Sequence, residues 1–138
     1  MKKILFVATI FKHFRAFHMP YIEWFEQQGW QVDAMANGDD PLENVHCSYN
    51  VPVSRNPFSI ANLKAFKQAK EIINREQYDI VYCHTAMGAV LARLSSIEAR
   101  KKYGTKVIYV AHGFHFFRGG PKMSWLMYYP MDKFLSRY

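Results

Sequence analysis

Short apolar runs that alternate with segments of helical periodicity constrain the fold of this chain more than any other feature. Residues 3–8 form such a run, which is typical of a strand covered on both faces of a parallel sheet. Four later runs have the length and turn boundaries of strands. We predict those strands over residues 31–35, 45–53, 79–83 and 106–110.

The segments between these strands are predicted to be helices. One covers residues 18–28 and ends at Gly29, and another is capped by Ser59 and has an apolar stripe from Ile60 to Ile73. A third covers residues 87–103. This alternation predicts an α/β fold with a Rossmann-like, doubly wound parallel sheet.

The length of the chain leaves room for one domain. Its 138 residues are predicted to form a single Rossmann-like domain over residues 1–138. Residues 122–138 are predicted to be helical, with a kink or interruption at Pro130. A doubly wound sheet usually continues from such a helix into another strand, so we expect an incomplete fold whose unpaired edge favours self-association.

The composition of the chain limits which partners and which cellular compartment we expect. A formal charge of +7 favours anionic partners, but no recognition-helix motif or aromatic RNA-binding signature is present, so no nucleic acid is predicted. Cys47 and Cys83 fall within predicted strands and no signal peptide or membrane-spanning run is found, which favours the cytoplasm. We predict peripheral contact with an anionic membrane through four aromatic residues near the end of the chain: Trp125, Tyr128, Tyr129 and Phe134. The alternative is that these side chains pack in the core.

The first candidate site follows the first strand. Ligands of open parallel sheets bind outside the carboxyl ends of the strands, so the residues after each strand are the candidates. Residues 9–18 are predicted to be a loop carrying Lys12, His13, Arg15 and His18. This loop is either a phosphate or acceptor site, or a solvated connection whose basic side chains face water.

Two later strand ends carry histidines. His84 follows the fourth strand and precedes Thr85, which is positioned to cap the next helix; a purely structural histidine is the alternative. After the fifth strand come His112, Gly113 and His115, and the glycine permits close backbone approach to a ligand. The alternative for this stretch is a core plug formed by its phenylalanines, Phe114, Phe116 and Phe117.

Cofactor motifs are missing from all of these segments. The chain has neither a Gly-x-Gly-x-x-Gly fingerprint nor a Gly-x-x-x-x-Gly-Lys-Ser/Thr loop. Cys83, His84, His112 and His115 lie close enough to adjacent strand ends to suggest a zinc site, but no Cys-x-x-Cys pair or matching spacing supports it. We therefore predict no cofactor and no metal.

Taken together, the motifs resemble the amino-terminal domain of glycosyltransferase family 4, in particular its capsular and exopolysaccharide members. The resemblance covers almost the whole chain and depends most on the strand-end histidines. The stretches that carry it are residues 3–8, 13–20, 78–85, 111–116 and 128–137.

This resemblance implies a GT-B enzyme with two Rossmann-like domains. Such an enzyme transfers a sugar with retention from a nucleotide-sugar donor, here expected to be a UDP-sugar, to a saccharide or lipid-linked acceptor of bacterial surface polysaccharide. The amino-terminal domain holds the acceptor. His112 matches the family's histidine near the donor sugar and is the expected catalytic residue. The expected substrate-binding residues are His13, Arg15, His18, His84, Gly113 and His115.

Two departures from the family pattern qualify this expectation. Many relatives have a Gly-Gly pair in the first loop, where this chain has residues 11–15, Phe-Lys-His-Phe-Arg. The carboxyl-terminal donor domain, with its Glu-x7-Glu motif, is absent from these residues, so this chain alone is expected to be inactive. The alternative function is a non-catalytic Rossmann-like module that binds an anionic sugar or nucleotide.

Overall fold

A computed structural model describes all residues from Met1 to Tyr138. Its strands form one parallel sheet in the order β3-β2-β1-β4-β5. They are β1 (Lys3–Ile10), β2 (Gln31–Asn37), β3 (Cys47–Asn50), β4 (Ile80–His84) and β5 (Lys106–Val110). The helices are α1 (Phe11–Phe17), α2 (Met19–Gln27), α3 (Ala61–Glu76), α4 (Ala86–Ser95), α5 (Ile97–Tyr103) and α6 (Lys122–Leu135).

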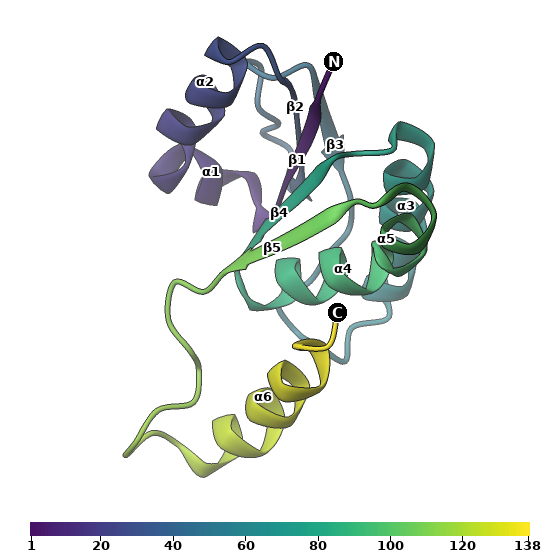
Figure 1. Cartoon of the computed structure of the whole chain (residues 1–138). Coiled ribbons are helices and arrows are strands. Elements are labelled where there is room, and N and C mark those ends of the chain that lie inside the picture. The colour runs from purple at the N-terminus through teal and green to yellow at the C-terminus, as the bar shows by residue number, and fades with distance from the viewer.

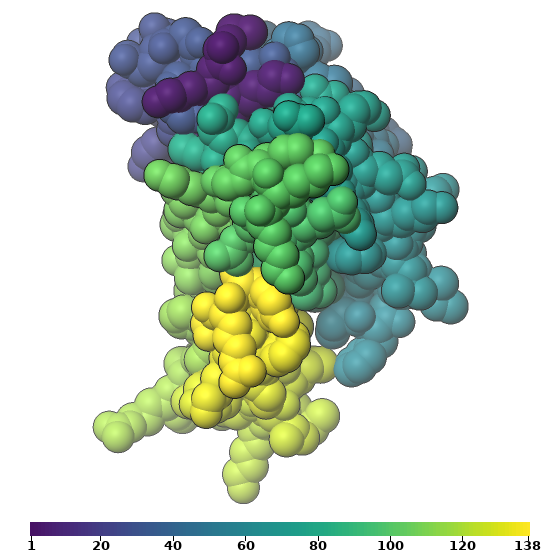
Figure 2. Space-filling model, turned by 45° about the vertical axis from the view of Figure 1, so that its right-hand side comes forward, coloured from purple at the N-terminus to yellow at the C-terminus, as the bar shows by residue number.

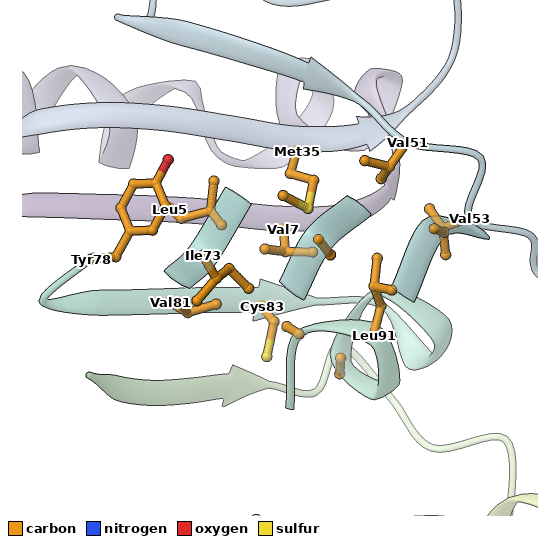
Figure 3. Packing of buried hydrophobic residues seen from close by; sticks show 14 of the residues in the cluster. Leu5, Val7, Met35, Val51, Val53, Ile73, Tyr78, Val81, Cys83 and Leu91 are labelled. Carbon is orange, nitrogen blue, oxygen red and sulfur yellow. The ribbon is translucent and has the colours of Figure 1, made fainter. Parts of the chain in front are cut away.

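Helices cover both faces of the sheet, which confirms the predicted doubly wound α/β fold. Helices α1 and α2 lie on one face, and α3, α4 and α5 lie on the other (Figure 1). Alternate β1 side chains enter different cores: Leu5 and Val7 pack toward α3 and α4, whereas Phe6 packs toward α1 and α2. The first of these cores joins residues from the sheet and helices, among them Val81 and Ile73 (Figure 3).

A buried polar contact holds the strands together away from their carboxyl ends. The Tyr78 hydroxyl donates a 2.5 Å hydrogen bond to Asp33 Oδ2, and both residues are buried. Thr105 Oγ1 donates to the Tyr78 carbonyl at 2.8 Å. Burial and the neighbouring Asp33 carboxylate raise the pKa of Tyr78, so its hydroxyl keeps its proton. These contacts connect β2 to the segments that precede β4 and β5.

Several predicted boundaries are wrong. The expected loop over residues 9–18 is largely the short helix α1, and the helix expected over residues 87–103 is divided into α4 and α5 at Ser96. Strand β3 covers only part of residues 45–53, since Pro52 has no N–H to donate to a ladder. Ser59 does not cap α3, because the helix begins one residue later than predicted and Ile60 occupies its N-cap position, with no side-chain cap hydrogen bond.

The apolar stripe predicted for α3 is only partly buried. Ala69 and Ile73 face the core as expected, and Ala65 joins them. Ile60 and Leu63 are instead 82% and 71% exposed. The first turns of α3 therefore present apolar side chains to solvent.

Helix α6 projects from the rest of the molecule, as the space-filling view shows (Figure 2). It continues through Pro130 without the predicted interruption. Its attachment to α4 includes an ion pair between Arg93 Nη2 and Asp132 Oδ1 at 3.1 Å. Trp125, Tyr129 and Phe134 are exposed, so the alternative prediction, that these aromatics pack in the core, is wrong for these three. None of the helices has the length and hydropathy needed to cross a membrane.

Candidate active site

A pocket of about 780 Å³ lies at the carboxyl edge of the sheet, where the topology of the fold places ligand sites. It is lined by the carboxyl ends of β1, β4 and β5, by α1, α4 and α6, and by Arg55 from the segment after β3. Both apolar and polar side chains contribute. Its polar and aromatic lining residues are Thr9, Lys12, His13, Phe17, Arg55, Thr85, Tyr109, His112, His115 and Tyr128.

Thr85 lines this pocket and is the N-cap residue of α4; we call this part of the pocket wall its floor. Its Oγ1 accepts hydrogen bonds from the backbone N–H of Gly88 at 3.3 Å and of Thr9 at 3.2 Å, and it lies 2.7 Å from Thr9 Oγ1. The predicted cap is thus confirmed. Thr85 has a φ of 65°, a conformation that costs a β-branched residue roughly 1–3 kcal/mol. The three contacts hold it there.

Gly88 makes the close approach of α4 to β1 possible. A Cβ at this position would lie 2.8 Å from Thr85 Oγ1 and 3.0 Å from two backbone atoms of Ala8. No larger residue fits without movement of the strand or loss of the Thr85 contacts. This glycine sets the position of the pocket floor.

Four histidines from separate segments meet beside the floor. His84 ends β4 and is fully buried, His112 follows β5 and is exposed, and His13 and His18 come from α1 and its boundary with α2. One ring nitrogen of each lies within 4.8 Å of the other three. We refer to His13, His18, His84 and His112 as the histidine cluster.

Direct contacts connect these rings. His13 Nε2 lies 3.1 Å from His18 Nε2, and His84 Nδ1 lies 3.2 Å from His112 Nε2. The rings of His18 and His84 have centroids 3.8 Å apart. Two nitrogens of the cluster, His18 Nδ1 and His84 Nε2, are buried and have no hydrogen-bond partner in the protein.

Burial keeps the inner rings of the cluster neutral. Burial, with smaller contributions from the neighbouring His18, His112 and His13, lowers the pKa of His84 to about 3. Burial likewise lowers the pKa of His18 to about 4, with contributions from His13 and His112. The pKa of His13 is lowered by burial, His112 and Arg55. Near pH 7 these three rings therefore offer lone pairs as well as N–H groups.

Other predicted site residues lie outside the histidine cluster. Arg15 pairs with Asp40 at 2.8 Å and donates to the Pro41 carbonyl, so the structure does not place Arg15 in the pocket. His115 lines the pocket and stacks on Tyr128 of α6, with ring centroids 4.5 Å apart. Gly113 also lines the pocket and has a φ of +135°, which favours glycine.

The zinc site suggested by Cys83, His84, His112 and His115 does not form. Cys83 packs in the core on the α3 and α4 face, where its thiol donates to the Ile108 carbonyl, and burial raises its pKa to about 12. The core plug is also wrong for Phe114 and Phe117, which are 53% and 59% exposed. Both cysteines are free.

The pocket residues that the sequence analysis did not assign to a site include Arg55 and Tyr128. Arg55 lies beyond β3, so an inspection of every strand end would have found it. Tyr128 comes from α6 and has no local signal, because only the packing of α6 brings it to the pocket.

Comparisons with known proteins agree with this architecture. A family model described as "Glycosyl transferase 4-like" matches residues 3–137. EpsD of Bacillus subtilis (strain 168), whose name describes it as a glycosyltransferase, is 52% identical over 137 residues; the alignment covers 99% of this chain and 36% of EpsD. The chain thus spans about a third of the length of this relative.

Two solved structures share the fold. The crystal structure of Acinetobacter baumannii MurG has a TM-score of 0.56 at 20% identity, covering 80% of this chain and 34% of MurG. Sucrose-phosphate synthase from Thermosynechococcus elongatus has a TM-score of 0.57 at 13% identity, covering 81% of this chain and 64% of the other. At these identities the similarity concerns the fold alone.

Proposed function

Because the chain belongs to the glycosyl transferase 4-like family, we propose that it forms the acceptor-side domain of a two-domain, GT-B sugar transferase. The reaction is transfer with retention from a nucleotide sugar, a UDP-sugar, to a saccharide or lipid-linked acceptor of a bacterial surface polysaccharide. The observation that carries this proposal is the pocket at the carboxyl edge of the sheet, with His112 and Gly113 among its lining residues.

His112 is the proposed catalytic residue. It is exposed, and its Nε2 faces His84 Nδ1 at 3.2 Å, so the buried ring of His84 orients it. Its other nitrogen, Nδ1, remains for a hydroxyl of the donor sugar. A hydrogen bond from a ring held in this way orients the sugar at the reaction centre without further loss of side-chain freedom.

Two cationic side chains in the pocket favour the binding of an anionic substrate. Lys12 and Arg55 both line the pocket, and no acidic residue does. Their charges favour the diphosphate of a nucleotide sugar or of a lipid-linked acceptor. In this proposal the two side chains attract the diphosphate, which in many relatives is approached by a Gly-Gly loop.

The same proposal places the enzyme in the cytoplasm, at the inner face of the membrane. The exposed aromatics Trp125, Tyr129 and Phe134, together with the net charge of +7, suit peripheral contact with anionic lipids. The exposed apolar turns of α3 suit self-association of this chain alone. Sedimentation with anionic vesicles at low and high salt tests the membrane contact, and equal recovery with neutral vesicles would exclude it.

The proposed function is tested by comparing this chain with a protein extended through a second, donor-binding domain. We expect transfer only from the extended protein, because one wall of a cleft neither holds both reactants nor excludes water. In the extended protein, His112→Ala should lower the rate of transfer by a factor on the order of 100 and leave folding intact.

Arg118→Ala is the matched control, since Arg118 is exposed on the same loop and does not line the pocket. If His112→Ala lowers thermal stability but keeps the specific activity, His112 is a structural residue. If the extended protein binds a nucleotide sugar but transfers nothing, the chain is part of a binding module, and the proposed reaction is wrong.

A further inference from the structure

The histidine cluster has the composition and spacing of a metal ligand shell. Its side chains come from α1, the α1–α2 boundary, the end of β4 and the segment after β5. They offer four imidazole nitrogens, all within 4.8 Å of one another. No function assigned to the pocket requires four imidazoles at one point.

We propose that the histidine cluster binds one divalent cation of the later first transition series, and Zn²⁺ in particular. With Zn–N bonds of about 2.0–2.1 Å, the nitrogens of a tetrahedral shell lie about 3.3 Å apart. The His13–His18 and His84–His112 pairs already lie at 3.1 and 3.2 Å. Only the longer separations, which reach at most 4.8 Å, must shorten.

The hydrogen-bond contacts of the cluster are compatible with a cation. In each contact pair one ring nitrogen donates its hydrogen to the lone pair of the other. The opposite nitrogens of the two buried rings, His18 Nδ1 and His84 Nε2, have no protein partner, so no hydrogen bond within the protein fixes the tautomer of either ring. Both rings can therefore turn the lone pair of the contact nitrogen toward a cation.

The ligand chemistry selects the class of ion. Imidazole nitrogen suits Zn²⁺, Cu²⁺, Ni²⁺ and Co²⁺, whereas Mg²⁺ and Ca²⁺ prefer carboxylate and carbonyl oxygen, which this cluster lacks. This proposal replaces the sequence-based prediction of no metal, which considered Cys83 and His115 in place of His13 and His18.

A bound ion would connect three parts of the pocket wall. His112 lies on the exposed segment after β5, while His18 and His84 are buried. Ligation through His112 Nε2 would fix this segment against the sheet and α1, and it would leave Nδ1 of the same ring for a sugar. The proposal rests on the positions of the rings and is independent of the proposed reaction.

The test uses the whole chain, without a histidine tag and freed of metal by a chelator. Titration with Co²⁺ should give the ligand-field absorption of a tetrahedral site, saturate at one equivalent, and be reversed by Zn²⁺. At a hundredfold excess over its dissociation constant, Zn²⁺ should raise Tm by about 5–10 °C, and Mg²⁺ should not.

Variants assign the ligands. His13→Ala and His112→Ala remove partly or fully exposed rings, so they are expected to fold, and each should weaken Co²⁺ binding at least tenfold. His115→Ala is the matched control, because His115 lines the pocket outside the cluster, and it should bind as the parent does.

Three results would overturn the metal site: no tetrahedral Co²⁺ spectrum, equal stabilisation by Mg²⁺ and Zn²⁺, or unchanged Co²⁺ binding in both cluster variants. None of these measurements involves a sugar. A failed metal site would therefore leave the proposed transfer untouched, and a failed transfer assay would leave the metal site untouched.

Discussion

Replacement of Gly88 by alanine tests whether the pocket floor depends on close contact between α4 and β1. Helix propensity alone predicts that Gly88→Ala stabilises the protein by about 1 kcal/mol, because glycine is a poor helix former. The structure predicts the opposite sign. The added Cβ would lie 2.8 Å from Thr85 Oγ1 and 3.0 Å from backbone atoms of Ala8 in a buried strand.

The size of the effect follows from these contacts. Forced overpacking costs about 2 kcal/mol, and displacement of the Thr85 hydroxyl from its capping position costs about 1 kcal/mol more. The gain in helix propensity offsets about 1 kcal/mol. The net loss is about 2 kcal/mol, which corresponds to a Tm lowered by about 8 °C for a domain of this size.

Urea and thermal unfolding followed by circular dichroism would measure the change. Thr85→Ala serves as the control background, because it removes the nearest contact but leaves those with Ala8. In that background, Gly88→Ala should cost less than in the parent, yet still destabilise. A Gly88→Ala protein as stable as the parent, or more stable, would refute the argument.

Two other predictions follow from the buried polar groups. In metal-free protein, the pKa values of His18 and His84, about 4 and 3, lie below the usual value near 6.5. Stability from these rings is therefore complete above pH 6.5 and is lost as the pH falls toward 4, by on the order of 2 kcal/mol or more. Urea unfolding at several pH values measures this loss; a slope unchanged by His18→Gln would contradict it. Arg93→Met leaves Asp132 without its 3.1 Å partner, so limited proteolysis should cleave α6 several times faster, with Asp132→Asn as the milder control. Equal cleavage rates would show that other contacts hold α6.

Local sequence signals determined much of the fold. The apolar run of β1 is buried on both faces as predicted, because a strand between two helical layers excludes polar side chains on either side. Thr85 caps α4 as predicted, since a cap depends on residues within one turn. His84 and His112 were found because every parallel strand delivers its carboxyl end to the same edge of the sheet.

The tertiary structure determines which residues meet at those strand ends. Strands β1, β4 and β5 are neighbours in the sheet although they are distant in sequence, and only this order brings His13 and His18 to His84 and His112. Local pattern assigned Arg15 to the same site, yet an acidic partner 25 residues away draws its side chain elsewhere. Contacts between distant segments depend on crossover connections and packing depth, and no local periodicity encodes either.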